Sequence, residues 1–231
     1  MAMLTATVVG PAGEDIYVDP LGQIRVRFHW DRESPGDDTS SCWVRTMQAV
    51  AGDGWGTQFI PRVGTEVVVT FEGGDIDKPL VLGSVYNGTH PPPFHLPSDR
   101  TRSGLRTRSS PTSDNHNELS FEDQSGAEEI YLRAARDFRA EIVQDRTLTV
   151  GQSSRVTVDG SHSEHIAAHA RLEVRKDRTV AVGGDATREV EGSETHTVQQ
   201  GLHQRVSGNL DRRVQGMTIS HHDGDARREP E

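Results

Sequence analysis

The chain has 231 residues, of which 32% are hydrophobic and only 5% aromatic, so its apolar material is thin for a single compact globule of that length. Its formal net charge of -10 argues against binding to nucleic acid or to an anionic membrane surface. No apolar run approaches the roughly 20 residues of a membrane span, no secretory signal pattern stands at the start, and a lone cysteine excludes an internal disulfide framework.

Residues 1–90 predict a small β domain. Ile24, Val26, Phe28 and Trp30 alternate with polar residues, which predicts a half-buried strand with all four on its inner side. Similar runs, separated by glycine-rich or acidic loops, cover residues 42–48, 65–71 and 80–86. Short strands without a helical period predict a closed barrel, in which Cys42 is expected to be a small core residue rather than a nucleophile.

This domain has a series of distinctive short motifs, in order FHWD at 28–31, SCWVR at 41–45, GWG at 54–56, IPRVG at 60–64, the acidic EGGDIDKP at 72–79 and GSVYN at 83–87. This order resembles the OB-fold segment of VgrG, the valine-glycine repeat protein G that forms the spike of bacterial type VI secretion. The resemblance identifies these OB family positions: Phe28, Trp30, Cys42, Trp43, Trp55, Pro61, Gly64, Pro79 and Tyr86. Because OB barrels often bind oligonucleotides, nucleic-acid binding is the alternative, but the acidic charge favours a structural collar.

Residues 91–116 show little apolar periodicity and predict a linker or extended strap. Its arginines are expected to pair with acidic neighbours rather than to form an anion site: Arg100, Arg102, Arg106 and Arg108. Residues 117–140 predict bridging strands on either side of a turn at 124–126, because apolar and polar residues alternate in 117–122 and again in 128–133.

Residues 141–219 repeat with a period of eight. The repeat places a β-branched aliphatic residue at each of ten successive octads, and these residues are the predicted trimer core: Ile142, Val150, Val158, Ile166, Val174, Val182, Val190, Val198, Val206 and Val214. Glycine often stands two residues later, at the predicted repeat turn: Gly160, Gly184, Gly192, Gly208 and Gly216. A strand of about five residues and a turn of about three account for the period.

One chain offers barely one or two core side chains per octad, too few to offset roughly 1–2 kcal/mol of backbone ordering per residue. Three chains wound about one axis would bring these aliphatic residues together and pair each strand with a neighbouring chain. The repeat glycines are then expected to permit a tight backbone turn that β-branched residues resist. A single-chain β-helix or a coiled coil would need a different period.

The predicted fold class is therefore all-β, an OB-fold barrel followed by an intertwined trimeric triple-stranded β-helix with octad repeats. The repeat also resembles the triple-stranded β-helix of VgrG and of the central spike of contractile phage tails. The predicted order is the OB collar at 1–90, the strap at 91–116, the bridging strands at 117–140, the needle at 141–219 and a C-terminal tail at 220–231.

The sequence holds no glycine-serine nucleophile elbow, phosphate-binding glycine loop or metalloprotease histidine motif, so no catalytic residue, enzymatic activity or cofactor is predicted. His162, His165 and His169 have spacings that suit a metal on one helical face, but the octad register separates them. His196, two residues before Val198, would lie beside its two symmetry mates on the axis. A polar or water-bridged ring is the favoured interpretation there, and an axial metal or anion site is the alternative.

The resemblance implies a non-enzymatic, membrane-puncturing spike, a homotrimer at the tip of a contractile injection tube that pierces a target envelope and carries effectors. It implies as partners the Hcp tube or a baseplate hub, and a PAAR-type tip protein or effector at the C-terminal end. Such a spike is assembled in the bacterial cytoplasm and then secreted to the extracellular space or a target cell. Family members carry a hub region ahead of the barrel, whereas this sequence begins only a few residues before it, so docking to the tube stays an open question. The alternative is a trimeric phage tail spike or adhesin-like fibre without a secretion role.

Overall fold

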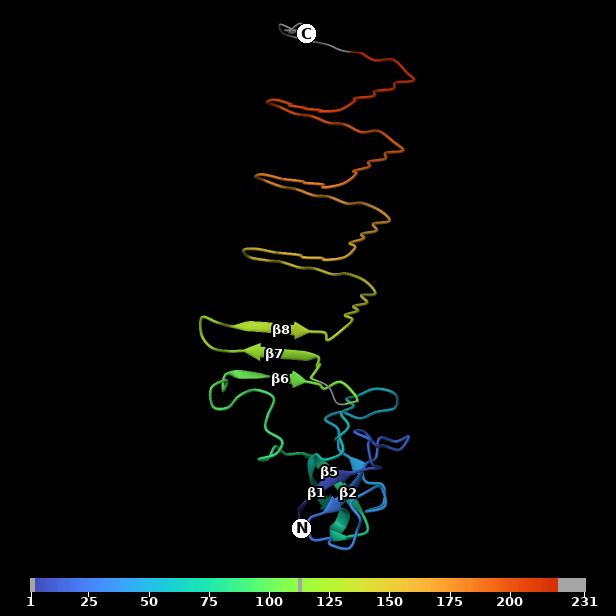
Figure 1. Ribbon diagram of the computed structural model, residues 1–231, viewed down its shortest axis with the longest axis vertical. Coiled ribbons are helices and arrows are strands. Elements are labelled where there is room, and N and C mark those ends of the chain that lie inside the picture. The colour runs from blue at the N-terminus through green and yellow to red at the C-terminus, as the bar shows by residue number, and fades with distance from the viewer. Residues whose placement is uncertain (1–2, 112–113, 220–231) are drawn as a thin grey trace. The chain divides into compact units, whose positions relative to one another are not determined.

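The computed structural model describes residues 3–111 and 114–219, so the predicted C-terminal tail at 220–231 lies outside the described residues. Strands form where β-branched and polar residues alternate, and no α-helix occurs among the residues described. The elements are β1 (Leu4–Val9), β2 (Arg25–Phe28), β3 (Arg45–Thr46), β4 (Glu66–Phe71), the 3-10 turn η1 (Glu72–Gly74), β5 (Pro79–Ser84), β6 (Arg102–Arg106), β7 (Glu118–Glu122) and β8 (Glu129–Arg133) (Figure 1).

Strands β1 to β5 form one sheet in the order β2-β1-β4-β5-β3. The two ends of this sheet meet, because Ile24 and Val44 exchange backbone hydrogen bonds of 3.0 and 2.8 Å between the start of β2 and the start of β3. A sheet whose first and last strands pair is a closed barrel, which is the predicted architecture.

The barrel interior is filled by small aliphatic side chains and one phenylalanine. Its buried core consists of Ala6, Val8, Ile24, Val26, Val44, Val67, Val69, Phe71 and Val81. The expected inward direction of Ile24 and Val26 is therefore confirmed, whereas Trp30 is largely exposed and stacks on Phe28 with ring centroids 5.5 Å apart. Strand β2 ends at Phe28, so the alternation no longer sets the direction of Trp30.

Two other predictions for this domain are wrong. Cys42 is exposed and is not a core residue. The strand predicted over 42–48 shrinks to the two residues of β3. The amide of Met47 still donates to the Val81 carbonyl of β5 at 2.8 Å, but residues 48–59 leave the sheet. The Gln48 side chain instead makes two hydrogen bonds, of 2.9 and 3.0 Å, with the backbone of Phe59. The intervening residues form a small hairpin with a bridge between Ala51 and Gly56.

Strands β6, β7 and β8 form a second, antiparallel sheet in chain order. The bridging strands β7 and β8 and the turn between them are confirmed, with the amide of Ala127 donating to the carbonyl of Gln124 at 2.9 Å and Gly126 in the left-handed region. Strand β6 lies inside the segment predicted to be a linker or strap, so that prediction is wrong for residues 102–106.

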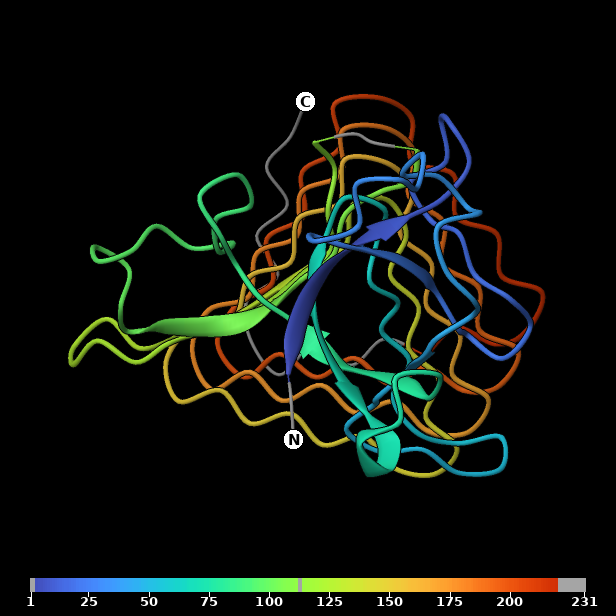
Figure 2. The same ribbon diagram turned by 90° about the horizontal axis from the view of Figure 1, so that it is seen from below.

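The chain divides into two compact units, 1–151 and 152–231. In the described part of the second unit the chain winds in wide turns along one direction, and an end-on view superimposes these turns (Figures 1 and 2). No helix or strand is assigned between residues 134 and 219. The predicted octad strands therefore do not pair within one chain.

Candidate functional site

The sheet β6–β7–β8 has one apolar and one polar face, set by the cross-strand register. Leu105, Leu119 and Leu132 stand opposite one another across the three strands, and Phe121 stands opposite Ile130. Strand alternation places all five on the same face, and all five are exposed. A contiguous patch of large aliphatic and aromatic side chains of this kind marks an interaction surface.

The opposite face is charged, yet it holds the buried residues of the sheet. Glu118 and Ser120 are 5% and 2% exposed. The Arg106 guanidinium Nε lies 2.7 Å from Glu118 Oε2, the Ser120 hydroxyl donates to Oε1 at 2.8 Å, and His116 Nε2 lies 3.4 Å from Oε2. The strap covers this face, because Pro93 accepts a hydrogen bond from Arg106 and Phe94 packs buried under the guanidinium.

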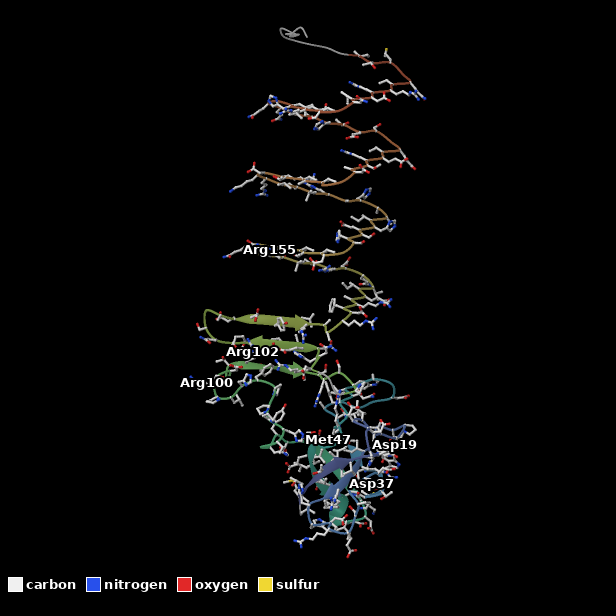
Figure 3. The ribbon with its side chains drawn as sticks, viewed as in Figure 1. Asp19, Asp37, Met47, Arg100, Arg102 and Arg155 are labelled. Atoms are coloured by element: carbon white, nitrogen blue, oxygen red, sulfur yellow. The ribbon has the colours of Figure 1, made fainter. Side chains whose placement is uncertain are left out.

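The Glu118 carboxylate is held ionised. Burial raises its pKa, but the hydrogen bonds from Arg106 and Ser120 and the positive charge of Arg106 outweigh burial, so its pKa lies below the ordinary value of 4.5. A second cross-strand pair, Arg102 with Glu122, has 3.5 Å between Nε and Oε2. Figure 3 marks the position of Arg102. Both pairs are directly opposite in the register, so the strap arginines 102 and 106 pair with acidic neighbours as predicted.

Close contact between β6 and β7 depends on one glycine. A Cβ atom on Gly104 would lie 2.3 Å from the Leu119 carbonyl oxygen and 2.7 Å from the Ser120 Cα, and the residue has φ of 156°. Only glycine satisfies both conditions, so this position fixes the register that separates the two faces.

The backbone of the octad segment bends at the same position in every repeat. A backbone bend occupies the two residues after each of the ten predicted core positions, from 143–144 to 215–216, without interruption. The ten side chains have 43 to 55% of their surface exposed, whereas the aliphatic residues two positions earlier are 68 to 79% exposed: Leu148, Val156, Leu172 and Val180. The predicted core positions are thus the more sheltered side chains of the repeat, on the N-terminal side of each bend.

Within a single chain, the described part of the octad segment has no buried core. Every described residue from 136 to 219 is exposed, and within that range no backbone amide donates to a backbone carbonyl. Peptide groups that have only water as a partner gain little to offset the entropy cost of an ordered backbone, and rows of aliphatic side chains exposed to water are unfavourable. Strands of a neighbouring chain would supply backbone hydrogen bonds and cover the aliphatic positions.

Within a single chain, none of the repeat glycines has a backbone conformation that requires glycine. All described glycines in the left-handed region lie at or before Gly126, and a Cβ on Gly160, Gly184, Gly192, Gly208 or Gly216 meets nothing within 4 Å. The same bend also forms with Gln152, Lys176 or Gln200 at the glycine position. The turn therefore needs no glycine within a single chain.

The OB family residues have several environments. Trp43 is half-buried, 5.0 Å from the Tyr17 ring, and carries the Arg25 guanidinium 4.6 Å from its ring centroid. Trp55 and Tyr86 are exposed, and Trp55 lies across Gly52, where a Cβ would approach the indole to 2.4 Å. The packing role of Gly52 and the burial of Glu118 cannot be predicted from the sequence, because both depend on tertiary contacts.

No three histidine, cysteine, aspartate or glutamate side chains in 3–111 and 114–219 gather as a metal site would require, and this covers His162, His165, His169 and His196. Over the same residues, no helix is long and apolar enough to cross a membrane.

Two family models match the regions described above. Residues 14–86 match the type VI secretion system/phage-baseplate injector OB domain, and residues 103–215 match the bacteriophage T4 gp5 C-terminal trimerisation domain. The chain is also 50% identical over 161 residues to the type VI secretion system spike protein VgrG4b of Pseudomonas aeruginosa, covering 69% of this chain and 20% of that protein. The chain belongs to the VgrG spike family.

Other VgrG proteins align over similar lengths. The spike protein VgrG1b of Pseudomonas aeruginosa is 45% identical over 157 residues, which is 67% of this chain and 21% of that protein. The actin cross-linking toxin VgrG1 of Vibrio cholerae is 44% identical over 163 residues, which is 71% of this chain and 15% of that protein. The chain thus spans about a fifth of the length of these two Pseudomonas aeruginosa relatives, VgrG4b and VgrG1b. The trimerisation match begins inside β6 and includes both the apolar sheet face and the octads.

Proposed function

We propose that three copies of this chain assemble into a VgrG spike. The observation that carries the proposal is the octad row of ten aliphatic residues on a segment that makes no backbone pairs with itself among its described residues. Threefold winding gives every strand a neighbouring chain and places three aliphatic side chains at each level of a shared core. The match of this region to a trimerisation domain supports the same assembly.

The apolar face of β6–β7–β8 extends this core toward the barrel in the proposal. Five large side chains covered by the same face of two other copies would bury a continuous surface, whereas the charged face stays covered by the strap. The needle then begins at β6 rather than at residue 141, so the predicted boundary between strap and needle moves toward the N-terminus.

The function of this assembly is mechanical. Many interchain hydrogen bonds along a narrow trimer make a stiff rod, which can concentrate the force of a contractile tube on a target envelope. In this account the Hcp tube or a baseplate hub lies behind the collar, and a PAAR-type tip protein or an effector binds at the C-terminal end. The spike is assembled in the cytoplasm and leaves the cell by type VI secretion. The chain itself needs no enzymatic activity for this function.

Secretion by the bacterium that encodes the chain tests this function. Val198→Asp puts three carboxylates into one level of the proposed core, whereas Gln199→Ala changes the adjacent residue on the bend. We expect Val198→Asp to abolish release of the chain into the medium under conditions that activate type VI secretion, and Gln199→Ala to leave release unchanged. Wild-type release of the Val198→Asp chain, at equal cellular levels, would contradict the proposed spike.

A further inference from the structure

The connection between β6 and β7 returns to the barrel. Its described part continues the β6–β7 pairing beyond the sheet, because the amide of Thr107 donates to the Asn117 carbonyl and the amide of Ser109 to the Asn115 carbonyl, both at 2.9 Å. Residues 107–111 and 114–117 are thus the two described arms of one hairpin, the β6–β7 hairpin.

This hairpin meets the barrel at Asp15. The Ser110 hydroxyl donates to Asp15 Oδ1 at 2.8 Å, and Arg62 Nη1 lies 3.2 Å from Asp15 Oδ2. The second Arg62 nitrogen, Nη2, donates to the backbone carbonyl of Arg108. The Asp15 carboxylate and the Arg62 guanidinium therefore hold Ser110 and Arg108 of the hairpin.

The barrel side of this contact is itself anchored. The amide of Val63 donates to the Asp15 carbonyl at 3.1 Å, and the amide of Gly64 donates to the carbonyl of Val8 in β1 at 2.8 Å. The side chains of Asp15 and Arg62 are only 26% and 28% exposed, so their ion pair is less screened by water and salt than a fully exposed pair. The residues that hold the hairpin are thus themselves joined to the barrel by backbone hydrogen bonds, one of which reaches strand β1.

We propose that Asp15 is a positioning residue that clamps the β6–β7 hairpin to the barrel, so that barrel and sheet transmit force as one body. The covalent connection from β5 to β6, residues 85–101, is then one of two parallel links rather than the only one. The clamp itself lies within one chain and does not depend on the number of copies, whereas its role in transmitting force rests on the proposed spike function.

Hydrogen exchange of the full-length chain tests the clamp. Asp15→Ala removes both acceptor oxygens, and we expect exchange at the amides of Thr107 and Ser109 to rise at least about tenfold while the Val67 and Val69 amides keep their protection. Asp37→Ala is the matched control: Asp37 also accepts loop hydrogen bonds, from Thr39, but it lies on a different loop of the barrel domain (Figure 3). The control is expected to leave Thr107 and Ser109 unchanged.

Unchanged exchange at Thr107 and Ser109 in Asp15→Ala would overturn the clamp. If Asp15→Ala also speeds exchange at the Val67 and Val69 amides of β4, the variant Ser110→Ala tests the clamp instead. This substitution removes only the hydrogen bond from the hairpin and leaves the Asp15–Arg62 ion pair intact. A faster exchange confined to the hairpin in Ser110→Ala supports the clamp, and no change refutes it. The mass of the particle, measured on the same samples, reports separately on the proposed trimer.

Discussion

At the scale of single residues, position in the octad rather than residue type decides how sheltered a side chain is. Val190 and Val180 are both valines of the same segment, yet 43% of Val190 and 69% of Val180 is exposed. The difference arises because Val190 directly precedes a bend and Val180 lies two residues before the next core position. A substitution at a core position should therefore have a much larger effect than one at a neighbouring residue.

Val190→Asp is expected to destabilise the assembly strongly. Three carboxylates at one level of a shared apolar core cost about 3 kcal/mol or more per chain, whereas Glu191→Ala on the adjacent bend should change stability by about 0.5 kcal/mol or less. Thermal unfolding followed by circular dichroism compares the two variants. Equal shifts of the melting temperature would show that the octad register is wrong.

Gly104→Ala is expected to loosen the β6–β7 pair. Its Cβ would meet the Leu119 carbonyl oxygen at 2.3 Å, and relief of that contact requires the strands to separate, at a cost of roughly 2–4 kcal/mol. Gly126→Ala is the graded control, since its φ of 82° is also unfavourable for alanine but no atom lies within 4 Å, which limits the cost to about 1 kcal/mol. Urea unfolding of both variants measures the difference, and a larger loss for Gly126→Ala would refute this packing role of Gly104.

At the scale of elements, the sheet β6–β7–β8 shows what a sequence pattern can and cannot predict. The alternation of Leu119 with Phe121, and of Ile130 with Leu132, correctly predicts β7 and β8. Strand β6 was missed because RSGLR contains a single large apolar residue, and its pairing depends instead on two arginines opposite two glutamates and on a glycine that fits against β7. Such complementarity is visible only once the partner strand is known.

The buried Glu118 makes the stability of this sheet depend on pH. Because its folded-state pKa lies below the ordinary value of 4.5, ionised Glu118 stabilises the fold above about pH 4.5, and this contribution is lost as pH falls through the folded-state pKa. Glu118→Gln is expected to cost about 1–3 kcal/mol at pH 7, because Arg106 loses a charged acceptor. Melting temperatures between pH 3 and 7 should show the advantage of the wild type shrinking below pH 4.5. An advantage that grows as pH falls would contradict the assigned ionisation.

At the scale of the whole molecule, the two regions satisfy the requirement for burial in different ways. The barrel is closed by its own hydrogen bonds around nine buried side chains, so alternation and turn residues suffice to predict it. The octad segment leaves every described residue exposed, and its period predicts the register but not the contacts between chains. The thin apolar composition of the sequence is explained if each chain supplies about one core residue per octad and the neighbouring copies supply the rest.

The most direct test of this account is the mass of the full-length chain in solution, measured by sedimentation equilibrium at micromolar concentration. Three chains of 25.4 kDa give 3 × 25.4 kDa, or about 76 kDa, and we expect this mass for the wild type with no dissociation on dilution through the micromolar range. A folded particle of 25.4 kDa would contradict the shared core on which the proposed spike depends.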